Sequence, residues 1–335
     1  MGDLIATFAT ALTGIAIFLL VLLGVYFVTG FLPGRAKERG RVAVFLGPAL
    51  LFLLIGLLIP AIRTIVISLY TNKGDALDVN KFVGLSNYRK IFGDKATRMV
   101  LLNNLWWVIL GTGFSVGVGL AVARIADQMK GERVWKSLIF LPTAISMVGA
   151  GIIWRFVYNK SPDPSHEFGL LNAVLNKVGA SPRIWLLQQQ NYVAGAPHLN
   201  TVLLIVVFVW IQTGFCTTVL SAAVKGVPDS LKEAASIDGA TDLQAFRKVT
   251  IPYIMPTIVA VSTTTIIAVL KVFDIIQSMT GGNFNTDVLA NEMYDKTYPQ
   301  NQPGYGAALA VIIFVVVIPV VIINLRSQRR ARELA

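Results

Sequence analysis

Three side chains in the apolar stretch 199–222 have types and spacing suited to binding a polyhydroxylated ligand such as a sugar. Phe208, Gln212 and Phe215 are four and three residues apart, so they share one face of a helix. An amide can hydrogen-bond hydroxyl groups, and aromatic rings pack against the apolar face of a sugar ring. The alternative is structural, with the glutamine bonding a neighbouring helix and the phenylalanines packing. The sequence leaves both interpretations open.

The stretch 253–279 also carries polar groups where polarity is costly. Residues 262–265 are four consecutive hydroxyl side chains, which let helices approach closely and can line a cavity. Lys271 and Asp274 are three residues apart and can pair on one helix face. Because charged groups within apolar stretches usually face a bundle interior or a water-filled path, we expect a gating or structural pair here rather than a sugar ligand.

The chain shows no pattern of residues typical of catalysis. It lacks the phosphate loop G-x-x-x-x-G-K-[S/T] and the zinc pattern H-E-x-x-H, and it has no persuasive Ser/His/Asp set. Its one cysteine, Cys216, cannot form an internal disulfide, and His166 and His198 have no ligand-spaced partner. We therefore predict that the chain is not an enzyme and holds no metal or cofactor of its own.

The elements that position these groups are predicted to be membrane spans. Of the 335 residues 55% are hydrophobic and 14% charged, whereas a soluble domain carries roughly 25% charged residues. A bilayer crossing needs about 20 mainly apolar residues. Seven runs meet this requirement: 6–32, 43–70, 99–123, 135–158, 199–222, 253–279 and 305–325. We expect an all-α polytopic membrane protein with seven transmembrane helices, and residues 82–92 as either an interfacial helix or an ordered loop.

The distribution of Lys and Arg sets the expected orientation. With the N-terminus outside, more than half of the 29 Lys and Arg residues fall in inner segments, as the positive-inside rule requires. Residues 226–252 and the tail 327–335 are then cytoplasmic, and the loops 159–198 and 280–304 are outside. The first run is too long, and its flank not basic enough, for a cleavable signal. Arg155 is interpreted as snorkelling to the interface.

A polar stretch between the fifth and sixth runs is predicted to form two short helices. Ser230-x-x-Glu233 has the pattern of a capping box, in which a hydroxyl and a carboxylate satisfy backbone N–H groups at a helix start. Thr241-x-x-Gln244 repeats the pattern. Gly239 lies between them, where the end of a helix favours a left-handed residue. The stretch is therefore predicted to be a helix–turn–helix.

Two prolines end this stretch, and with them it resembles a known signature. Pro252 and Pro256 are expected to end or kink the second helix. E-A-A, three residues, Gly, and nine residues before a group ending in Pro is the signature of permease subunits of bacterial ABC importers. Here it consists of Glu233, Ala234, Ala235, Gly239, Val249, Ile251 and Pro252. Asp238 and Phe246 match the fuller form of the sugar permeases. Val249 and Ile251 replace the commoner Ile and Leu, and the likeness continues through most of residues 43–326.

The resemblance implies a fold and a domain organisation. The fold would be the six-helix core of a type I ABC importer permease with one extra N-terminal helix. The expected parts are the extra helix and basic hinge (1–42), the first core span with an outer segment (43–98), the core (99–326) with its cytoplasmic loop (226–252), and a basic tail (327–335).

The resemblance also implies that the loop 226–252, the coupling loop, docks on a separate ATPase that binds ATP and Mg²⁺. The coupling residues would be Glu233, Ala234, Ala235, Asp238, Gly239 and Pro252. The two acids would meet basic or amide groups of the ATPase, and the glycine would allow close backbone approach. For Glu233 and Asp238 the alternative is simple helix-end electrostatics.

In the maltose-type importer that the chain resembles, sugar contacts come from the spans on either side of this loop. Counted from Glu233, the matching positions are Phe208, Ile211, Gln212, Phe215, Thr265 and Val269. The expected function is import of a di- or oligosaccharide, of maltose or α-glucoside type, across the bacterial cytoplasmic membrane. The expected partners are a second permease, two ATPases, and an extracytoplasmic binding protein that meets the loops 159–198 and 280–304.

Other functions remain open at this stage. Related permeases carry glycerol-phosphate esters or polyols. An ion-coupled secondary carrier could use Lys271 and Asp274 as its coupling site, and a membrane scaffold would carry no substrate. Neither of these last two explains the spacing from Glu233 to Pro252. No nucleic acid partner is expected, because the net charge of +11 follows from the positive inner loops.

Overall fold

The computed structural model describes residues 34–71, 81–129, 131–161, 169–187 and 196–333, with a few earlier positions (13, 20, 21, 23–27 and 30). It consists of two compact units, Met1–Val66 and Ile67–Ala335, and each is presented by itself. Most of the first expected span, 6–32, lies outside the described residues.

The first unit contains the second expected span as one run of helix. It comprises α2 (Gly34–Leu53), a π-helical turn η1 (Leu54–Leu58) and α3 (Ile59–Ile67), which leads into the second unit. The widened turn lies directly before Pro60, whose ring would clash with the carbonyl of Gly56 in a regular helix. Neither η1 nor α3 buries a side chain.

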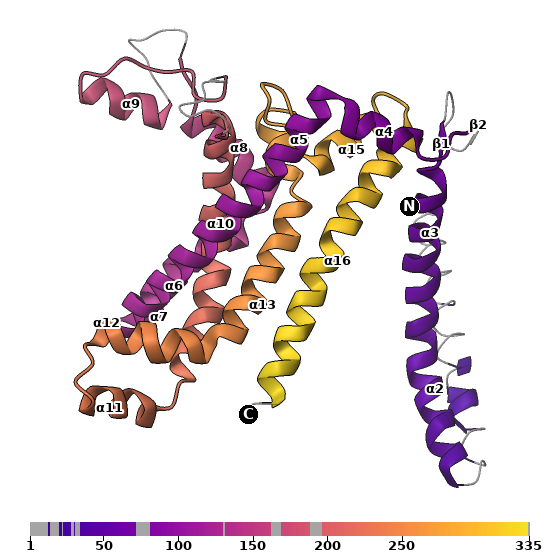
Figure 1. Ribbon diagram of the computed structural model, residues 1–335, viewed down its shortest axis with the longest axis horizontal. Helices are drawn as coiled ribbons and strands as arrows, with labels where there is room; N and C mark the ends of the chain where they lie inside the picture. Colours follow the sequence, from indigo (N-terminus) through magenta and orange to yellow (C-terminus); the bar gives the residue numbers. More distant parts are fainter. Residues whose placement is uncertain are drawn as a thin grey trace. The chain divides into compact units, whose positions relative to one another are not determined.

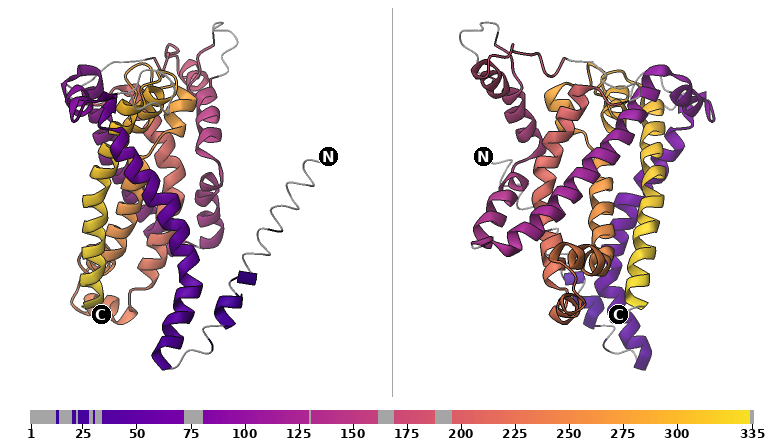
Figure 2. Two further views of the ribbon diagram at one scale, coloured as in Figure 1. Left: turned by 90° about the vertical axis from the view of Figure 1, so that its right-hand side faces the viewer. Right: turned by 60° about the vertical axis from the view of Figure 1, so that its left-hand side comes forward.

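The second unit is a helical bundle with a short antiparallel strand pair, in which Tyr70 opposes Phe82. Its elements are β1 (Tyr70–Thr71), β2 (Lys81–Phe82), α4 (Ser86–Gly93), α5 (Lys95–Trp106), η2 (Trp107–Thr112), α6 (Gly113–Gln128), α7 (Glu132–Phe140), η3 (Leu141–Ala144), α8 (Met147–Val157), α9 (Leu170–Lys177), α10 (Leu199–Lys225), α11 (Asp229–Ile237), α12 (Asp242–Ala245), η5 (Phe246–Thr250), α13 (Ile251–Leu270), α14 (Asp274–Met279), α15 (Leu289–Thr297) and α16 (Pro303–Glu333). Figure 1 shows α11 and α12 at one end of this unit and α4, α9 and α15 at the other, and the views in Figure 2 agree. We refer to these as the coupling end and the far end.

Five helices of the described chain are long and apolar enough to cross a membrane. They are Val44–Ile67, Lys95–Ala126, Leu199–Lys225, Asp242–Leu270 and Pro303–Gln328. The expected span 135–158 is not one straight helix, because the helices on either side of Ile145 and Ser146 are bent by 98°. Ser146 caps α8 through its hydroxyl, which accepts a hydrogen bond from Gly149 N at 3.0 Å. Counted as one span, the bent pair makes six in the described residues, and the count of seven stays a prediction.

The second helix of the coupling loop does not end at the prolines, so of the two expectations for them, an end or a kink, the first is wrong and the second stays a prediction. α12, η5 and α13 follow one another as the single span Asp242–Leu270. The π-helical turn η5 directly precedes Pro252, as η1 precedes Pro60, and Pro256 lies inside α13. The wider π-helical turn before each proline thus makes room for the proline ring, and the helix continues without a break.

Buried apolar side chains hold the second unit together in three clusters. The largest joins η2, α8, α10 and α14 through side chains such as Trp107, Leu204 and Ile275. At the far end Ile91 of α4 packs with Leu289 and Leu309. Residues 86–93 are therefore helical, as one of the two sequence interpretations proposed, and one side of this helix is anchored in the protein.

Candidate functional site

The turn of the coupling loop has the geometry that the sequence predicted. Gly239 has φ +79°, a left-handed conformation that other residues rarely adopt. The N–H of Ala240 donates to the carbonyl of Ala235 at 2.9 Å, closing the end of α11 in a Schellman-type cap. The glycine therefore sets the angle between the two loop helices.

Only one of the two predicted capping boxes is present. The Thr241 hydroxyl accepts from Gln244 N, and the Gln244 side chain accepts from Thr241 N at 2.9 Å. The box at Ser230 is wrong, because α11 already begins at Asp229 and its N-cap is Pro228, with no side-chain cap. Ser230 lies inside the first turn, so its hydroxyl is not at a helix start.

Most of the predicted coupling residues are exposed at this end of the unit. Glu233, Ala234, Asp238, Gly239 and Pro252 are exposed, and Ala235 is buried. Ile237 lies among them and is 87% exposed. An apolar side chain this open, with exposed Leu231 and Leu243 nearby in sequence, is typical of a surface that a partner covers.

Charged and aromatic contacts join the coupling loop to the spans. The guanidinium of Arg124, near the end of α6, lies 4.7 Å from the ring centroid of Phe246 in η5. Glu132 at the start of α7 forms ion pairs with Lys225 at the end of α10 and with Lys136. A hollow of about 370 Å³ between these elements is lined by Arg124, Lys225 and Phe246, among others. The loop therefore contacts α6 through Phe246, and beside it the ion pairs of Glu132 join α7 to α10.

The predicted sugar contacts lie close together, but in the packed interior. Phe208, Ile211, Thr265 and Val269 are buried, whereas Gln212 and Phe215 are half-buried. The Gln212 amide donates to the Thr265 hydroxyl at 3.4 Å. The Phe208 ring meets Trp107 edge-on at a centroid distance of 5.9 Å. This packing supports the structural alternative for Phe208, and a sugar-binding role for these residues stays a prediction.

Lys271 and Asp274 do not share a helix, because α13 ends at Leu270 and α14 begins at Asp274. No ion pair joins the two within the described part of the chain, so the expected pairing on one face is not formed. Lys271 instead lines an otherwise largely apolar hollow of about 490 Å³ with Phe273 and Tyr294. A gating role for the two residues stays a prediction.

Buried asparagines fix the loops at the far end, and the sequence analysis predicted none of their bonds to backbone. Asn103 Nδ2 donates to the carbonyls of Asn285 (2.7 Å) and Asp287 (2.9 Å). The neighbouring Asn104 accepts from the N–H of Leu289 at 2.6 Å. Asn285 has φ +61°, a strained value for a residue other than glycine. The clamped carbonyl helps hold the residue there.

Two further buried asparagines act in the same way, and we call these hydrogen-bonded asparagines the asparagine clamps. Asn200 Nδ2 donates to the carbonyl of Phe284 at 2.8 Å and to that of Leu186 at 3.3 Å. Asn172 accepts from Trp185 Nε1 at 3.0 Å and donates to the carbonyl of Asn159 at 2.8 Å. Each asparagine ties together segments that are far apart in sequence.

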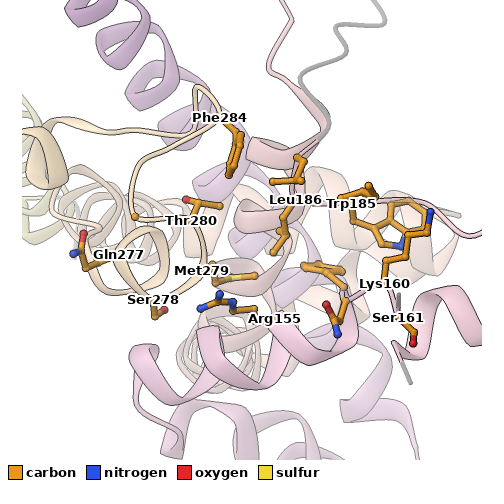
Figure 3. A pocket seen from close by; sticks show the side chains of 15 residues that line it. Arg155, Lys160, Ser161, Trp185, Leu186, Gln277, Ser278, Met279, Thr280 and Phe284 are labelled. Atoms are coloured by element: carbon orange, nitrogen blue, oxygen red, sulfur yellow. The ribbon is translucent and has the colours of Figure 1, made fainter. Parts of the chain in front are cut away.

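These clamps frame a polar hollow of about 700 Å³, shown in Figure 3. Its walls come from the end of α8 and residues 158–161, from residues 184–187, and from residues 277–284. The close packing of α8 on α14 shapes it, because a Cβ at Gly151 would lie 2.0 Å from Ser278 Oγ. Arg155, interpreted from the sequence as a snorkelling residue, is one of its lining side chains. In the sequence, the one sign of this hollow was Arg155, a charged residue at the end of an apolar run.

One carboxyl group at the far end has a markedly shifted acidity. Burial, together with a hydrogen bond to Glu292, raises the pKa of Asp287 well above its usual range. Asp287 Oδ1 also accepts from Val288 N and from Asn291 Nδ2, at 2.8 and 2.9 Å. The Asp287–Glu292 pair therefore retains a proton at pH values where separate carboxyl groups would both be ionised.

Residues 100–333 match the family described as binding-protein-dependent transport system inner membrane component. The chain is 42% identical over 291 residues to the osmoprotective compounds uptake permease protein of Synechocystis sp., which covers 87% of this chain and 100% of that protein. It is 40% identical over 297 residues to the alpha-glucoside transport system permease protein of Rhizobium meliloti, covering 88% and 84%.

A solved structure has the same fold. It is that of a bacterial alginate ABC transporter in complex with a pentasaccharide-bound periplasmic protein, with a TM-score of 0.72 at 21% identity, covering 88% of this chain and 96% of that one. The fold and the exposed coupling loop define a membrane permease component. The chain belongs to the family of binding-protein-dependent transport system inner membrane components.

Proposed function

We propose that this chain is the permease subunit of an ABC importer for a di- or oligosaccharide of the α-glucoside or maltose type. The observation that carries the proposal is the exposed coupling loop with its Glu233 signature, on a chain that belongs to this transport family. The substrate class is supported by the alpha-glucoside permease, 40% identical to this chain. Of the alternatives left open by the sequence, a polyol or a glycerol-phosphate ester, the polyol is the second candidate, because the 42% identical relative is named a permease for osmoprotective compounds.

The proposed mechanism transmits force from a separate ATPase through the coupling loop. Glu233, Asp238 and Gly239 would contact the ATPase, and Ile237 would be covered by it. The contacts of Arg124 and Glu132 would pass the movement on to α6, α7 and α10. The chain would supply docking and a path, and the partner would supply ATP hydrolysis.

The proposed assembly contains this chain, a second permease, two ATPases and an extracytoplasmic binding protein. Seven spans with the N-terminus outside would place the coupling end in the cytoplasm and the far end outside. The far-end loops would then face the binding protein. Gln212, with its half-buried amide, is the residue of the predicted sugar set that we propose as a substrate contact.

The experiment is sugar uptake by the reconstituted assembly, measured with a panel of labelled sugars. Gly239→Asp should leave the chain in the membrane and abolish most ATP-driven uptake, because it strains the turn and adds a side chain at the docking surface. Gly84→Asp is the matched control, since Gly84 also has a positive φ, +55°, and a Cβ there would meet only the Phe82 ring, at 3.9 Å. It lies outside both the coupling loop and the loops 159–198 and 280–304 that are expected to meet the binding protein. Equal uptake by both variants would refute the docking role of the loop.

A further inference from the structure

The polar hollow at the far end carries an unusual charge distribution. Arg155 and Lys160 both line it, and none of the described residues that line it is acidic. Neither cation forms an ion pair or a hydrogen bond within the described parts of the chain. Both side chains are exposed, so they are available to a ligand that enters the hollow.

The remaining walls combine amides, hydroxyls and aromatic rings. Gln277, Ser278 and Thr280 come from α14 and the turn after it, Tyr158 follows the last residue of α8, and Trp185 comes from residues 184–187. Figure 3 shows Gln277, Ser278 and Arg155 in one part of the hollow, and Trp185 and Lys160 in another. Hydroxyl-rich ligands need such polar groups, and a sugar ring packs on aromatic faces. The hollow thus offers both hydrogen-bonding groups and aromatic faces within about 700 Å³.

The hollow is preformed, because buried side chains fix its walls. Asn172 holds Trp185 and the backbone of Asn159, and Asn200 holds the carbonyls of Leu186 and Phe284. All four of these partners line the hollow themselves. A site whose walls are fixed before binding loses little entropy when a ligand enters.

A purely structural explanation accounts for one cation and not for the other. Arg155 lies in the last turn of α8, where a positive charge is stabilised by the helix dipole. Lys160 lies beyond the end of that helix, so the dipole does not explain it. Within the described residues the two cations have no ion-pair partner and the walls of the hollow hold no acid, which favours an anionic ligand group in the hollow.

We propose that the polar hollow is an entry subsite for a sugar that carries an acidic group. A disaccharide acid would span both parts of the hollow: one unit would pack on Trp185 and the other would bond Gln277 and Ser278, while the positive charges of Arg155 and Lys160 would attract its carboxylate. This inference rests on the proposed function, since it places the far end outside the membrane on the path of a substrate. It extends the substrate class from neutral glucosides to glycosyl acids.

The test uses maltitol and maltobionate, which differ only in a CH2OH group against a carboxylate. Their binding to the reconstituted permease and ATPase assembly, without the binding protein, is measured by ligand-observed saturation-transfer NMR. Charge-assisted hydrogen bonds predict that maltobionate binds roughly tenfold tighter than maltitol. This preference should fall as salt is raised, because exposed charges are screened.

Variants separate the two halves of the subsite. Arg155→Gln and Lys160→Gln should each remove most of the preference for maltobionate and leave maltitol binding unchanged. Trp185→Leu should weaken both probes by a similar factor. Arg89→Gln is the control, because Arg89 is another exposed far-end cation, on α4, that lines no hollow described above. ATP hydrolysis by each variant assembly verifies that it has folded and assembled.

Three results would overturn the proposal. The first is equal binding of maltitol and maltobionate by the wild-type assembly. The second is an unchanged preference for maltobionate in both Gln variants. The Gln variants could also weaken capture of the binding protein while both probes bind as before, which would make the hollow a protein contact. The proposed function is tested separately by ATP-driven uptake of neutral sugars with the binding protein present, which can succeed whichever result the NMR gives.

Discussion

Replacing Phe246 with leucine should loosen the link between ATP hydrolysis and transport. The substitution keeps an apolar side chain but removes the ring face that lies 4.7 Å from the Arg124 guanidinium. Both residues are half-buried, and a cation–π contact in such a place contributes about 0.5–1 kcal/mol, or roughly a 2–5-fold change in an equilibrium. We expect the sugar transported per ATP hydrolysed to fall by a factor within this range.

The assay measures uptake and ATP hydrolysis together in proteoliposomes that contain the complete assembly and its binding protein. Phe246→Tyr keeps the ring and should retain the wild-type ratio. Arg124→Leu removes the other partner, so it should lower the ratio to a similar extent. The double variant completes a cycle, and because each single change already removes the contact, the two effects should not add.

The reasoning is refuted by either of two outcomes. If Phe246→Tyr lowers the ratio as much as Phe246→Leu, the ring face is not what positions the loop. If the effects of Phe246→Leu and Arg124→Leu add fully in the double variant, the two side chains act independently.

Three further predictions concern other parts of the chain. Gln212→Ala removes one amide contact, so the KM for uptake should rise roughly fivefold while ATPase association persists; loss of assembly instead would show that the amide serves helix packing. Because the pKa of Asp287 is raised, the protonated side chain stabilises the fold fully below the ordinary carboxyl pKa, and this stabilisation is lost as the pH rises through the raised pKa. The Tm of the wild type should therefore fall with rising pH, and Asp287→Asn should make that fall smaller. Parallel curves of Tm against pH for the two proteins would contradict the raised pKa. Asn103→Leu leaves two carbonyls without their donor and should lower the Tm by several degrees; an unchanged Tm in differential scanning fluorimetry would show that the clamp is dispensable.

Features set by near neighbours in the chain were predictable from the sequence. Gly239 is left-handed, and Thr241 and Gln244 form a capping box, because these geometries depend on residues three to five apart. The predicted capping box at Ser230 is absent for a reason that is also local, because Pro228 takes the N-cap position and α11 starts earlier than predicted.

Features made by distant segments were not predictable in this way. The Asn103 clamp joins residues 182 and 184 positions apart, and nothing near Asn103 marks its partners. The polar hollow needs α8, residues 184–187 and α14 to meet, so Arg155 alone suggested only snorkelling. Lys271 and Asp274 had a helical spacing, but the chain breaks between them, and periodicity cannot anticipate a break that tertiary packing imposes.

The asparagine clamps at the far end also imply an order in which parts of the chain are synthesised and folded. Asn103 and Asn104 leave the ribosome early, whereas the backbone that they bind is synthesised 182 to 185 residues later. Until then the two amides have only water as a partner, which the rim of the bilayer supplies and its hydrocarbon centre does not. This part of the far end therefore takes its final form only after residue 289 has been synthesised. A soluble protein that recognises these loops would bind only chains that have passed that point.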